Sequence, residues 1–389
     1  MFSDLAPHDI GQYFTMPVMP TRNNRGCGFI ATRFNPQNVD TFLIYVCLPG
    51  HAERSMASIT FGEWPTMDGA AMQSIDKPSF LIIGTRGSPL ALVQANQVRA
   101  ELARVHQIPK DEIAIKIIST AGDRSQVSNI SLGEIGGKGL FSKEIEDQLR
   151  SGNIDLAVHS TKDMATQLPD GLIMPYFLPR EDIRDAFLSL NANSVDDLPQ
   201  NAIIGTSSLR RRAQLRRYRP DLTMIEFRGN LGTRLKKLEE GLADATLLAA
   251  AGLKRLGQSN RIIAYLDPNH FPPAPAQGAI GLELRASDTR TMEIASPLNH
   301  APTHAEITAE RAMLKIIDGS CRTPIGAVSH QKNGTLSLKG QLLSPDGSQV
   351  FEAEISGPVA NAKELGKALG QALLSKAGSA FFTALETVK

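Results

Sequence analysis

Residues 203–215, IIGTSSLRRRAQL, decide the fold of this chain. An apolar run ends in Gly-Thr-Ser-Ser and changes at once to an arginine-rich segment, the pattern of a buried parallel strand followed by a helix. Ser207 or Ser208 is the expected N-cap. The turn presents free backbone N–H groups, the positive end of a helix dipole and the guanidinium groups of residues 210–212 to one small volume. It therefore predicts a site for carboxylates or phosphates, without indicating a reaction.

The composition is that of a globular protein with ordinary charge content. The 389 residues suffice for two or three domains, and a net charge of +1 argues against nucleic acid as the main partner. No run approaches the roughly 18 to 20 apolar residues of a membrane span, and no secretory signal is recognised, so we expect a cytoplasmic protein. Cys27, Cys47 and Cys321 show no CxxC spacing, so neither a disulfide framework nor a zinc site is indicated.

Residues 1–78 differ from the rest of the chain. TFLIYVCLPG at 41–50 is the one strand-like run and no helical period is sustained, so we expect a poorly ordered leader. Two explanations stay open: a start assigned too far upstream, with Met72 as the true start, or a transit peptide. Cys27 and Cys47 fall in this leader and receive no role.

From Phe80 onward, apolar runs of strand length alternate with helical periods, which indicates parallel sheets built by right-handed crossovers. Ser88-Pro89 is an N-cap and N1 pair that opens a helix. The stretch 121–139 has no period of its own and is expected to be a lid or disordered. A second unit begins near residue 180, and the chain returns to the first unit at 273–285.

After His300 the pattern changes again, to a helix, a tight loop at 318–326, two alternating strands around a Pro-Asp-Gly turn and a last amphipathic helix. The predicted fold class is α/β, with two periplasmic-binding-protein-like doubly wound α/β domains plus a small α+β C-terminal domain. The predicted domains are 79–179 with 276–297 for the first, 180–275 for the second and 298–389 for the third.

Polar clusters follow four of the predicted strands, two in each unit. In open α/β sheets ligands bind outside the carboxyl ends of the strands, so the clusters predict one cationic cleft between the units. Asp163 is the lone acid among these cations. It either forms an ion pair with a neighbouring cation or stabilises a cationic intermediate, and both readings stay open here. The clusters are residues 85–88, 159–163, 206–212, and 228–230 with Arg234.

Four other features carry weaker signals. His159 lacks a second His or Cys at ligand spacing, so a packed, hydrogen-bonded histidine is favoured over a metal ligand. Cys321 lies in a loop beside Arg322, which favours the nucleophilic thiolate, although an inert thiol is the simpler reading of the residue alone. GGKG at 136–139 lacks the Ser or Thr of a phosphate loop. The segment 209–219 lacks the interleaved aromatic residues of a nucleic-acid site.

From Phe80 to its end the chain resembles the porphobilinogen deaminase, or hydroxymethylbilane synthase, family of tetrapyrrole biosynthesis. The resemblance rests, in family order, on GTRGSPLAL, GGKGLFSKE, VHSTKD, GTSSLRRRAQL, RGNLGTRLKKL, AAGLKRLG, PAQGAIGLE, TAERAM and the cysteine loop. It implies a three-domain, monomeric transferase that joins four porphobilinogen molecules head to tail with release of ammonia. It also implies a dipyrromethane cofactor held by a thioether on Cys321, from which hydrolysis frees the product.

The resemblance assigns roles residue by residue. Asp163 matches the carboxylate that stabilises the azafulvenium cation left when ammonia departs, and the other catalytic groups implied are Cys321, Lys162 and Arg86. Thr161 and Ser320 depart from the commoner family residues. The residues implied to hold the cofactor are Cys321, Asp163, Lys162, Ser160, Thr206, Ser207, Ser208, Arg210, Arg211, Arg228 and Arg234. Those implied to contact substrate are Arg86, Ser88, Gln94, Arg228, Gln277, Lys138 and Lys143.

The alternative from another class is a two-lobed carboxylate receptor without catalysis, since two α/β lobes that close on an anion describe such receptors as well. A receptor needs neither the third domain nor Cys321. These two features therefore favour the enzyme.

Overall fold

The structure is a computed structural model, and it is described by unit because the chain divides into Met1–Asp76 and Lys77–Lys389. In the first unit, strands β1 (Thr32–Arg33) and β2 (Leu43–Ile44) pair antiparallel, and β2 lies in the run predicted to be strand-like. The residues that the structure describes are 32–33, 43–44, 80–123, 142–317 and 323–387.

Several sequence-based expectations concern residues outside these ranges. They are the disorder of most of the leader, the start at Met72, the lid between 124 and 139, and the positions of Lys138 and Cys321. These expectations stay predictions.

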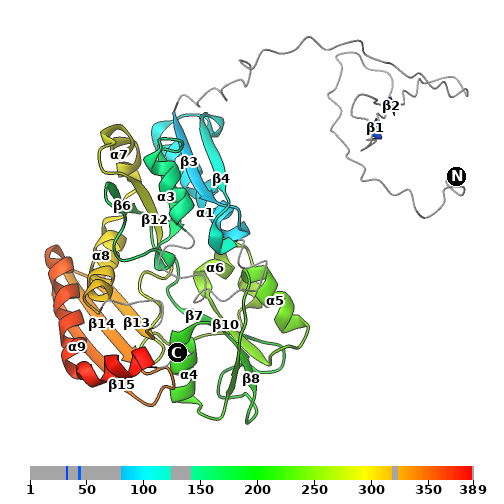
Figure 1. Cartoon of the computed structure of the whole chain (residues 1–389), viewed down its shortest axis with the longest axis vertical. Helices are drawn as coiled ribbons and strands as arrows, with labels where there is room; N and C mark the ends of the chain where they lie inside the picture. The colour runs from blue at the N-terminus through cyan, green and yellow to red at the C-terminus, as the bar shows by residue number, and fades with distance from the viewer. Residues whose placement is uncertain (1–31, 34–42, 45–79, 124–141, 318–322, 388–389) are drawn as a thin grey trace, which may run out of the picture. The chain divides into compact units, whose positions relative to one another are not determined.

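The first sheet of the second unit is mixed and lies between two helices (Figure 1). Its core follows the period of two in β3, because Leu81 and Ile83 pack with α1 (Pro89–His106) while Ile82 packs on the side of α3 (Lys143–Arg150). α7 (Thr289–Ala295) follows the last strand. The strand order is β4 (Ile113–Ile118), β3 (Leu81–Arg86), β5 (Leu156–Ser160), β12 (Ile280–Arg285) and β6 (Leu172–Phe177).

The second sheet has the same layered plan. Leu215 of α4 (Leu209–Tyr218) packs on one face, and the other face is covered by α5 (Leu231–Glu239) and α6 (Ala250–Arg255). The strand order is β11 (Ala264–Tyr265), β7 (Asp185–Ser189), β10 (Ala245–Ala249), β8 (Ile203–Gly205) and β9 (Thr223–Ile225).

Both sheets are mixed, whereas the strand–helix alternation predicted parallel sheets. β12 is antiparallel to β5, and its first residue pairs with the last residue of β5, Ile280 with Ser160. In the same way, Asp185 at the start of β7 pairs with Ala249 at the end of β10. Each of these strands enters its sheet from the crossover at the carboxyl ends of the parallel strands. It can therefore only run in the opposite direction.

The two crossovers between the sheets lie side by side. The outgoing segment donates to the returning one through Leu178 N to Ile280 O and Glu181 N to Gly278 O, both 3.2 Å. Gly278 has φ of 89°, and a Cβ built there would lie 2.4 Å from Glu181 O. Only glycine fits this close approach.

A third sheet, of three antiparallel strands, packs against α8 (Ala301–Ile316) and α9 (Ala362–Thr387), which are seen on the left in Figure 1. The sequence predicted two of its strands and missed the first. That strand turns at Asn333-Gly334, both with positive φ, a hairpin signal that the sequence carries. The strands are β13 (Ile325–Lys332), β14 (Thr335–Leu343) and β15 (Val350–Pro358).

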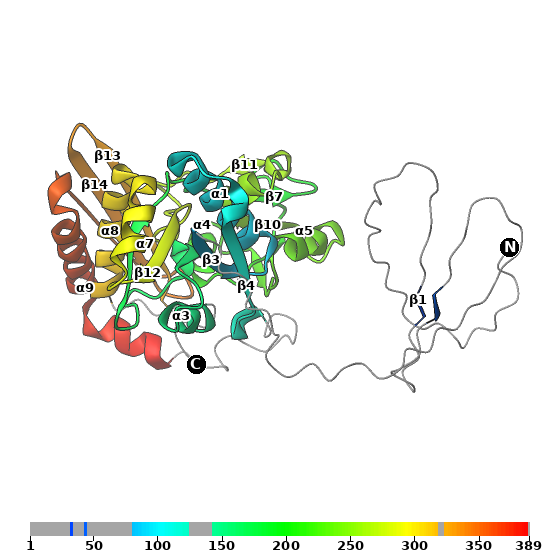
Figure 2. The same ribbon diagram turned by 90° about the horizontal axis from the view of Figure 1, so that it is seen from above.

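Figure 2 gives the view from above, in which α8 and α9 lie on the side of β13 and β14. Each of the three sheets draws its strands from one of the three predicted domains. The domain boundaries themselves stay a prediction. None of the helices in the described ranges combines the length and the hydropathy of a membrane span.

Candidate active site

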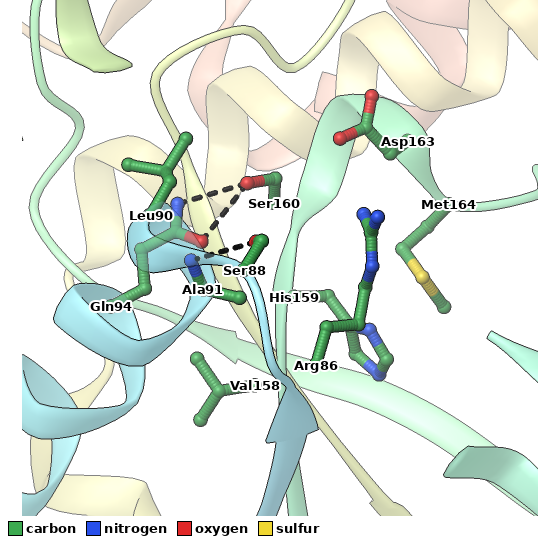
Figure 3. A pocket seen from close by; sticks show the side chains of 10 residues that line it. All are labelled: Arg86, Ser88, Leu90, Ala91, Gln94, Val158, His159, Ser160, Asp163 and Met164. Atoms are coloured by element: carbon green, nitrogen blue, oxygen red, sulfur yellow. Dashed lines mark hydrogen bonds between the residues drawn. The ribbon is translucent and has the colours of Figure 1, made fainter. Parts of the chain in front are cut away.

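The carboxyl ends of β3 and β5 form a pocket beside the start of α1 (Figure 3). Ser88 is the N-cap of α1 as predicted, with Ala91 N donating to its Oγ at 3.3 Å. Gln94, one turn later, donates from Nε2 to Ser160 Oγ at 2.9 Å. The pocket is lined by Arg86, Ser88, Leu90, Ala91, Gln94, Val158, His159, Ser160, Asp163 and Met164.

Arg86 reaches into this pocket from the end of β3, and Figure 3 shows its guanidinium group on the side where Asp163 and Met164 lie. Its Nε donates to Asp123 Oδ1 at 3.1 Å. Burial would raise the pKa of Asp123, but hydrogen bonds from Arg86 and Thr120 outweigh burial and hold that pKa below its usual value. Arg86 is therefore oriented by an ionised carboxylate that the sequence did not indicate.

Lys162 and Asp163 stand on a single 3-10 turn, Thr161–Asp163, directly after β5. Both residues have accessible surface, yet protein atoms crowd around Lys162, and this desolvation lowers the pKa of its ammonium group to about 8. Asp163 opposes the shift, whereas the positive charges of Arg211 and Arg210 add to it. Because water still reaches Lys162, the downward direction is what matters here. The turn thus brings a readily titrated amine next to a carboxylate.

A chain of two hydrogen bonds links Lys162 to the second sheet. Lys162 Nζ donates to Gln277 Oε1 at 3.3 Å, and Gln277 Nε2 donates to Asp185 Oδ1 at 3.0 Å. Gln277 is fully buried in the returning crossover. Its position was predicted to contact substrate, and its partners in the structure are protein groups. The substrate role stays a prediction.

Arg210 and Arg211 are almost fully buried at the start of α4 and share the carboxylate of Asp185. Arg211 Nη2 donates to Asp185 Oδ1 at 2.7 Å, and Arg210 Nη1 donates to Asp185 Oδ2 at 2.8 Å. The two arginines outweigh burial and hold the pKa of Asp185 far below its usual value. Arg210 Nη1 also donates to Gln214 Oε1 and to Pro272 O. The described partners of Arg210 are therefore groups of the protein itself, and its guanidinium group does not point into an open pocket.

The Gly-Thr-Ser-Ser turn that precedes α4 is held by its own hydroxyl groups. Ser208 is the N-cap, with Arg211 N at 3.4 Å from its Oγ, which confirms one of the two predicted caps. Thr206 Oγ1 accepts from Ser208 N at 3.3 Å, and Ser207 Oγ accepts from Phe227 N at 3.1 Å. These hydroxyl oxygens therefore already accept backbone hydrogen bonds that hold the turn in place.

The last cluster follows β9. Arg228 Nε donates to Glu226 Oε2 at 3.0 Å, and Arg234 Nε donates to Gly229 O at 2.9 Å. The pKa of Arg234 is lowered to about 10, chiefly by burial and also by the charge of Arg211, while Asp163 and Glu226 offset only part of the shift. Arg234, on α5 beside the second sheet, therefore interacts electrostatically with Asp163, which follows β5 of the first sheet.

The structure brings members of all four clusters near one another: Arg86, Ser88, Ser160 and Asp163 share a pocket, and Lys162, Arg210, Arg211 and Arg234 interact electrostatically with each other or with Asp163. Lys143 is an exposed residue at the start of α3 and, among the described residues, forms no hydrogen bond or ion pair with them. Its role, like those of Lys138 and Cys321, stays a prediction.

His159 is a packed, hydrogen-bonded histidine, as predicted. Its Nε2 lies 2.9 Å from Glu283 Oε2, and both side chains are buried. No group of three or more His, Cys, Asp or Glu side chains within the described ranges is placed to hold a metal ion.

Four acids that the sequence did not single out organise this region: Asp123, Asp185, Glu283 and Glu310. Asp185, Glu283 and Glu310 are buried and face a cation or a histidine. The available signal was local, because Asp185 opens the apolar run DAFLS and Glu283 interrupts IGLELR. An acid inside a buried strand requires a partner, although its identity depends on the fold.

Two family models and a curated relative all relate this chain to porphobilinogen deaminases. A family model described as "Porphobilinogen deaminase, dipyromethane cofactor binding domain" matches residues 81–293, and one described as "Porphobilinogen deaminase, C-terminal domain" matches residues 304–375. A curated porphobilinogen deaminase of Paracoccus denitrificans is 48% identical over 310 residues, which are 80% of this chain and 98% of that protein.

Two solved structures that resemble the chain are distant from it in sequence. A periplasmic substrate-binding protein of an ABC transporter from Coxiella burnetii is 14% identical, covers 60% of this chain and 97% of its own, and has a TM-score of 0.35. A lipoprotein of the YaeC family from Enterococcus faecalis is 14% identical, covers 60% and 96%, and also has a TM-score of 0.35. Neither likeness supports a conclusion about function.

Two layered α/β sheets whose strand ends gather cations near one exposed aspartate define the class, an α/β protein with a cationic site. The family models and the curated relative make the class specific. The chain belongs to the porphobilinogen deaminase family.

Proposed function

We propose that this chain is a porphobilinogen deaminase, a transferase that condenses four porphobilinogen molecules head to tail on a dipyrromethane cofactor and finally hydrolyses the product to hydroxymethylbilane. One observation supports the assignment most directly. Asp163, the acid expected to face the reacting pyrrole, lies at strand ends where the positive groups Lys162, Arg211 and Arg234 converge from two sheets.

The residues of this region fit a cofactor that carries several carboxylates. The pKa of Arg234 and that of Lys162 both lie below their usual values, because burial and neighbouring cations are not fully balanced by Asp163. A ligand that brings negative charge would relieve this imbalance. A neutral or cationic ligand would increase it.

In the proposal, the acidic side arms of the cofactor are held by basic and hydroxyl groups from both sheets, and Cys321 supplies the thioether. When bound, dipyrromethane supplies the ring carbon to which the incoming unit is joined. Incoming substrate lies in the pocket with Arg86, and Lys143 and Lys138 assist from the following segment. The holding groups are Lys162, Ser160, Thr206, Ser207, Ser208, Arg210, Arg211, Arg228 and Arg234, and the substrate contacts also include Ser88, Gln94 and Gln277.

Asp163 is the proposed counter-charge for the substrate. When the aminomethyl group of porphobilinogen loses ammonia, positive charge is left on the pyrrole ring. A carboxylate fixed beside the ring N–H stabilises that charge. Lys162, whose pKa is lowered by the surrounding protein atoms, holds or releases a proton more readily than an ordinary lysine. Arg86 fixes an acidic side arm of the substrate next to Asp163.

The finer points of the proposal concern the whole molecule. We place it in the cytoplasm as a monomer, with porphobilinogen as its partner and with neither nucleic acid nor membrane. The net charge of +1 supports the absence of a polyanionic partner. The family match favours the enzyme over the two-lobed receptor without catalysis.

The cofactor assignment is tested by intact-mass measurement of the purified full chain. The protein should carry an added mass of two pyrrole units, and Cys321→Ser should lack both that mass and activity on porphobilinogen. An active protein without the added mass would refute the role of Cys321.

The role of Asp163 is tested by Asp163→Asn, with Asp170→Asn as the control at an exposed site seven residues further on. We expect Asp163→Asn to retain its fold and lose about 100- to 1,000-fold or more in kcat, because the developing cation loses its counter-charge. Asp170→Asn should match the parent protein. Near-normal kcat in Asp163→Asn would exclude the proposed role.

A further inference from the structure

The turn that bears Asp163 is anchored by its backbone and not by its carboxylate. Among the residues that the structure describes, none donates a hydrogen bond to the Asp163 side chain. The start of the turn is fixed to the returning crossover, because Thr161 N donates to Ala279 O at 3.1 Å. The position of the carboxylate therefore depends on what holds the other end of the turn.

That other end is held by an arginine of the third domain. Arg311, on α8, donates from Nη2 to Ala165 O at 2.6 Å and from Nη1 to Met164 O at 3.4 Å. Met164 is buried and ends the turn directly after Asp163. One planar guanidinium group thus binds two successive carbonyls immediately beyond the carboxylate, a geometry that suits arginine better than lysine.

α8 is itself fixed at the neighbouring residue. Glu310 accepts from both terminal nitrogens of Arg180 at 2.8 and 2.9 Å, and from Ala276 N at 2.6 Å. Its side chain is fully buried. The helix position next to Arg311 is therefore tied to both crossovers, which gives Arg311 a rigid base.

The charge of Arg311 has a partner as well. Burial lowers the pKa of the guanidinium group, and the nearby Glu283 carboxylate offsets part of that shift. Arg311 therefore remains a cation in a largely enclosed site. A half-buried cation that makes two carbonyl contacts beside the proposed counter-charge does more than link two domains at the surface.

We propose that Arg311 is a positioning residue for Asp163, which it places by holding the carbonyl groups of Met164 and Ala165. This inference rests on the proposed function, since it concerns the reaction that Asp163 serves. Arg311 touches neither substrate nor cofactor in this account. Its loss lets the turn relax, so that the carboxylate moves away from the ring that it should stabilise.

The test compares Arg311→Met and Arg311→Lys with Arg216→Met in the full-length protein that carries its cofactor. Arg216 is the matched control, because it also donates from a helix to a carbonyl of the third domain, Pro345 O at 3.2 Å. We expect Arg311→Met to lower kcat about 10- to 100-fold with KM within about threefold, since a misplacement of about 1 Å has that effect. Arg311→Lys should recover part of the loss, and Arg216→Met should lose little.

A double mutant separates positioning from a general structural role. If Arg311 acts through Asp163, then in the Asp163→Asn background Arg311→Met should lower kcat by less than about twofold. Should Arg311→Met fail to fold, Arg311→Gln, a neutral donor of similar length, replaces it in the same comparison.

Two results would overturn the inference: unchanged kcat in Arg311→Met, or an equal loss with and without the Asp163 carboxylate. A third measurement keeps the proposed function separate. If the unmodified protein carries no two-pyrrole mass or does not consume porphobilinogen, the proposed function fails, whatever Arg311 does. If it does both and Arg311→Met remains fully active, only the role of Arg311 is wrong.

Discussion

Replacing Asp185 with Asn should severely destabilise the protein. The Asp185 side chain is fully buried, and its two oxygens accept from Arg211 at 2.7 Å, Arg210 at 2.8 Å and Gln277 at 3.0 Å. Asn keeps the size but removes the charge, so two buried guanidinium groups lose their shared counter-charge. Neutralising one partner of a buried ion pair costs about 3–5 kcal/mol in the free energy of unfolding.

The pH dependence has a definite sign. The pKa of Asp185 is lowered in the folded protein, so its stabilising contribution is complete above the unfolded value of about 4 and declines as the pH falls below that value. The variant lacks the contribution at every pH. The difference in stability between parent and variant should therefore be constant near neutral pH and shrink in acid.

Thermal unfolding at pH 7 and at lower pH measures both effects. Asp185→Asn should lower Tm on the order of 10 °C at pH 7. Asp221→Asn is the control, because Asp221 pairs with Arg219 at 2.7 Å in the more accessible connection between α4 and β9, where water replaces the lost partner. Equal Tm values for the two variants, or a gap that widens in acid, would refute the reasoning.

Three further predictions concern single positions. Because the pKa of Lys162 is lowered, activity on porphobilinogen should decline at a lower pH than the titration of an ordinary lysine would give, and Lys162→Arg should move that decline to higher pH; an alkaline decline that is unchanged in Lys162→Arg would contradict this. Thr161→Val should raise the free energy of unfolding by about 1 kcal/mol in chemical denaturation, since Thr161 is buried and its Oγ1 has no hydrogen-bond partner among the described residues; a less stable variant would show that the hydroxyl is satisfied. Gly278→Ala should lower the free energy of unfolding by about 1–3 kcal/mol more than Gly334→Ala. Both glycines have positive φ, but only at Gly278 would a Cβ meet a backbone oxygen, that of Glu181. Equal losses of Tm in the two variants would count against this close approach.

The local elements were largely readable from the sequence. Ser88 and Ser208 cap their helices as predicted, because capping depends on a few consecutive residues. The alternation of apolar runs and helical periods also predicted two α/β units, which the structure shows as two five-stranded sheets covered by helices. Strand β13 was missed, although Asn333-Gly334 gives a local hairpin signal.

Strand direction and charge pairing were not readable in this way. Nothing in IGLELR states that β12 runs against β5, because its direction follows from where the crossover delivers it. Likewise, the arginine run predicted an anion site, but Arg210 and Arg211 form ion pairs with a carboxylate of the protein, that of Asp185. Arg234 and Lys162 have no such buried bidentate partner among the described residues and are the better candidates for an external anion.

The sequence by itself determined the class of protein: its periodicities specify layered α/β units, and its motifs place the chain in its family. Only the tertiary structure decided which cations are available to a ligand and what holds Asp163 in place. The physical reason is that helix and strand periods arise from neighbours along the chain, whereas the partner of a buried charge is whichever group folding brings within hydrogen-bond distance. Asp185 and Arg311 meet their partners across many residues of sequence.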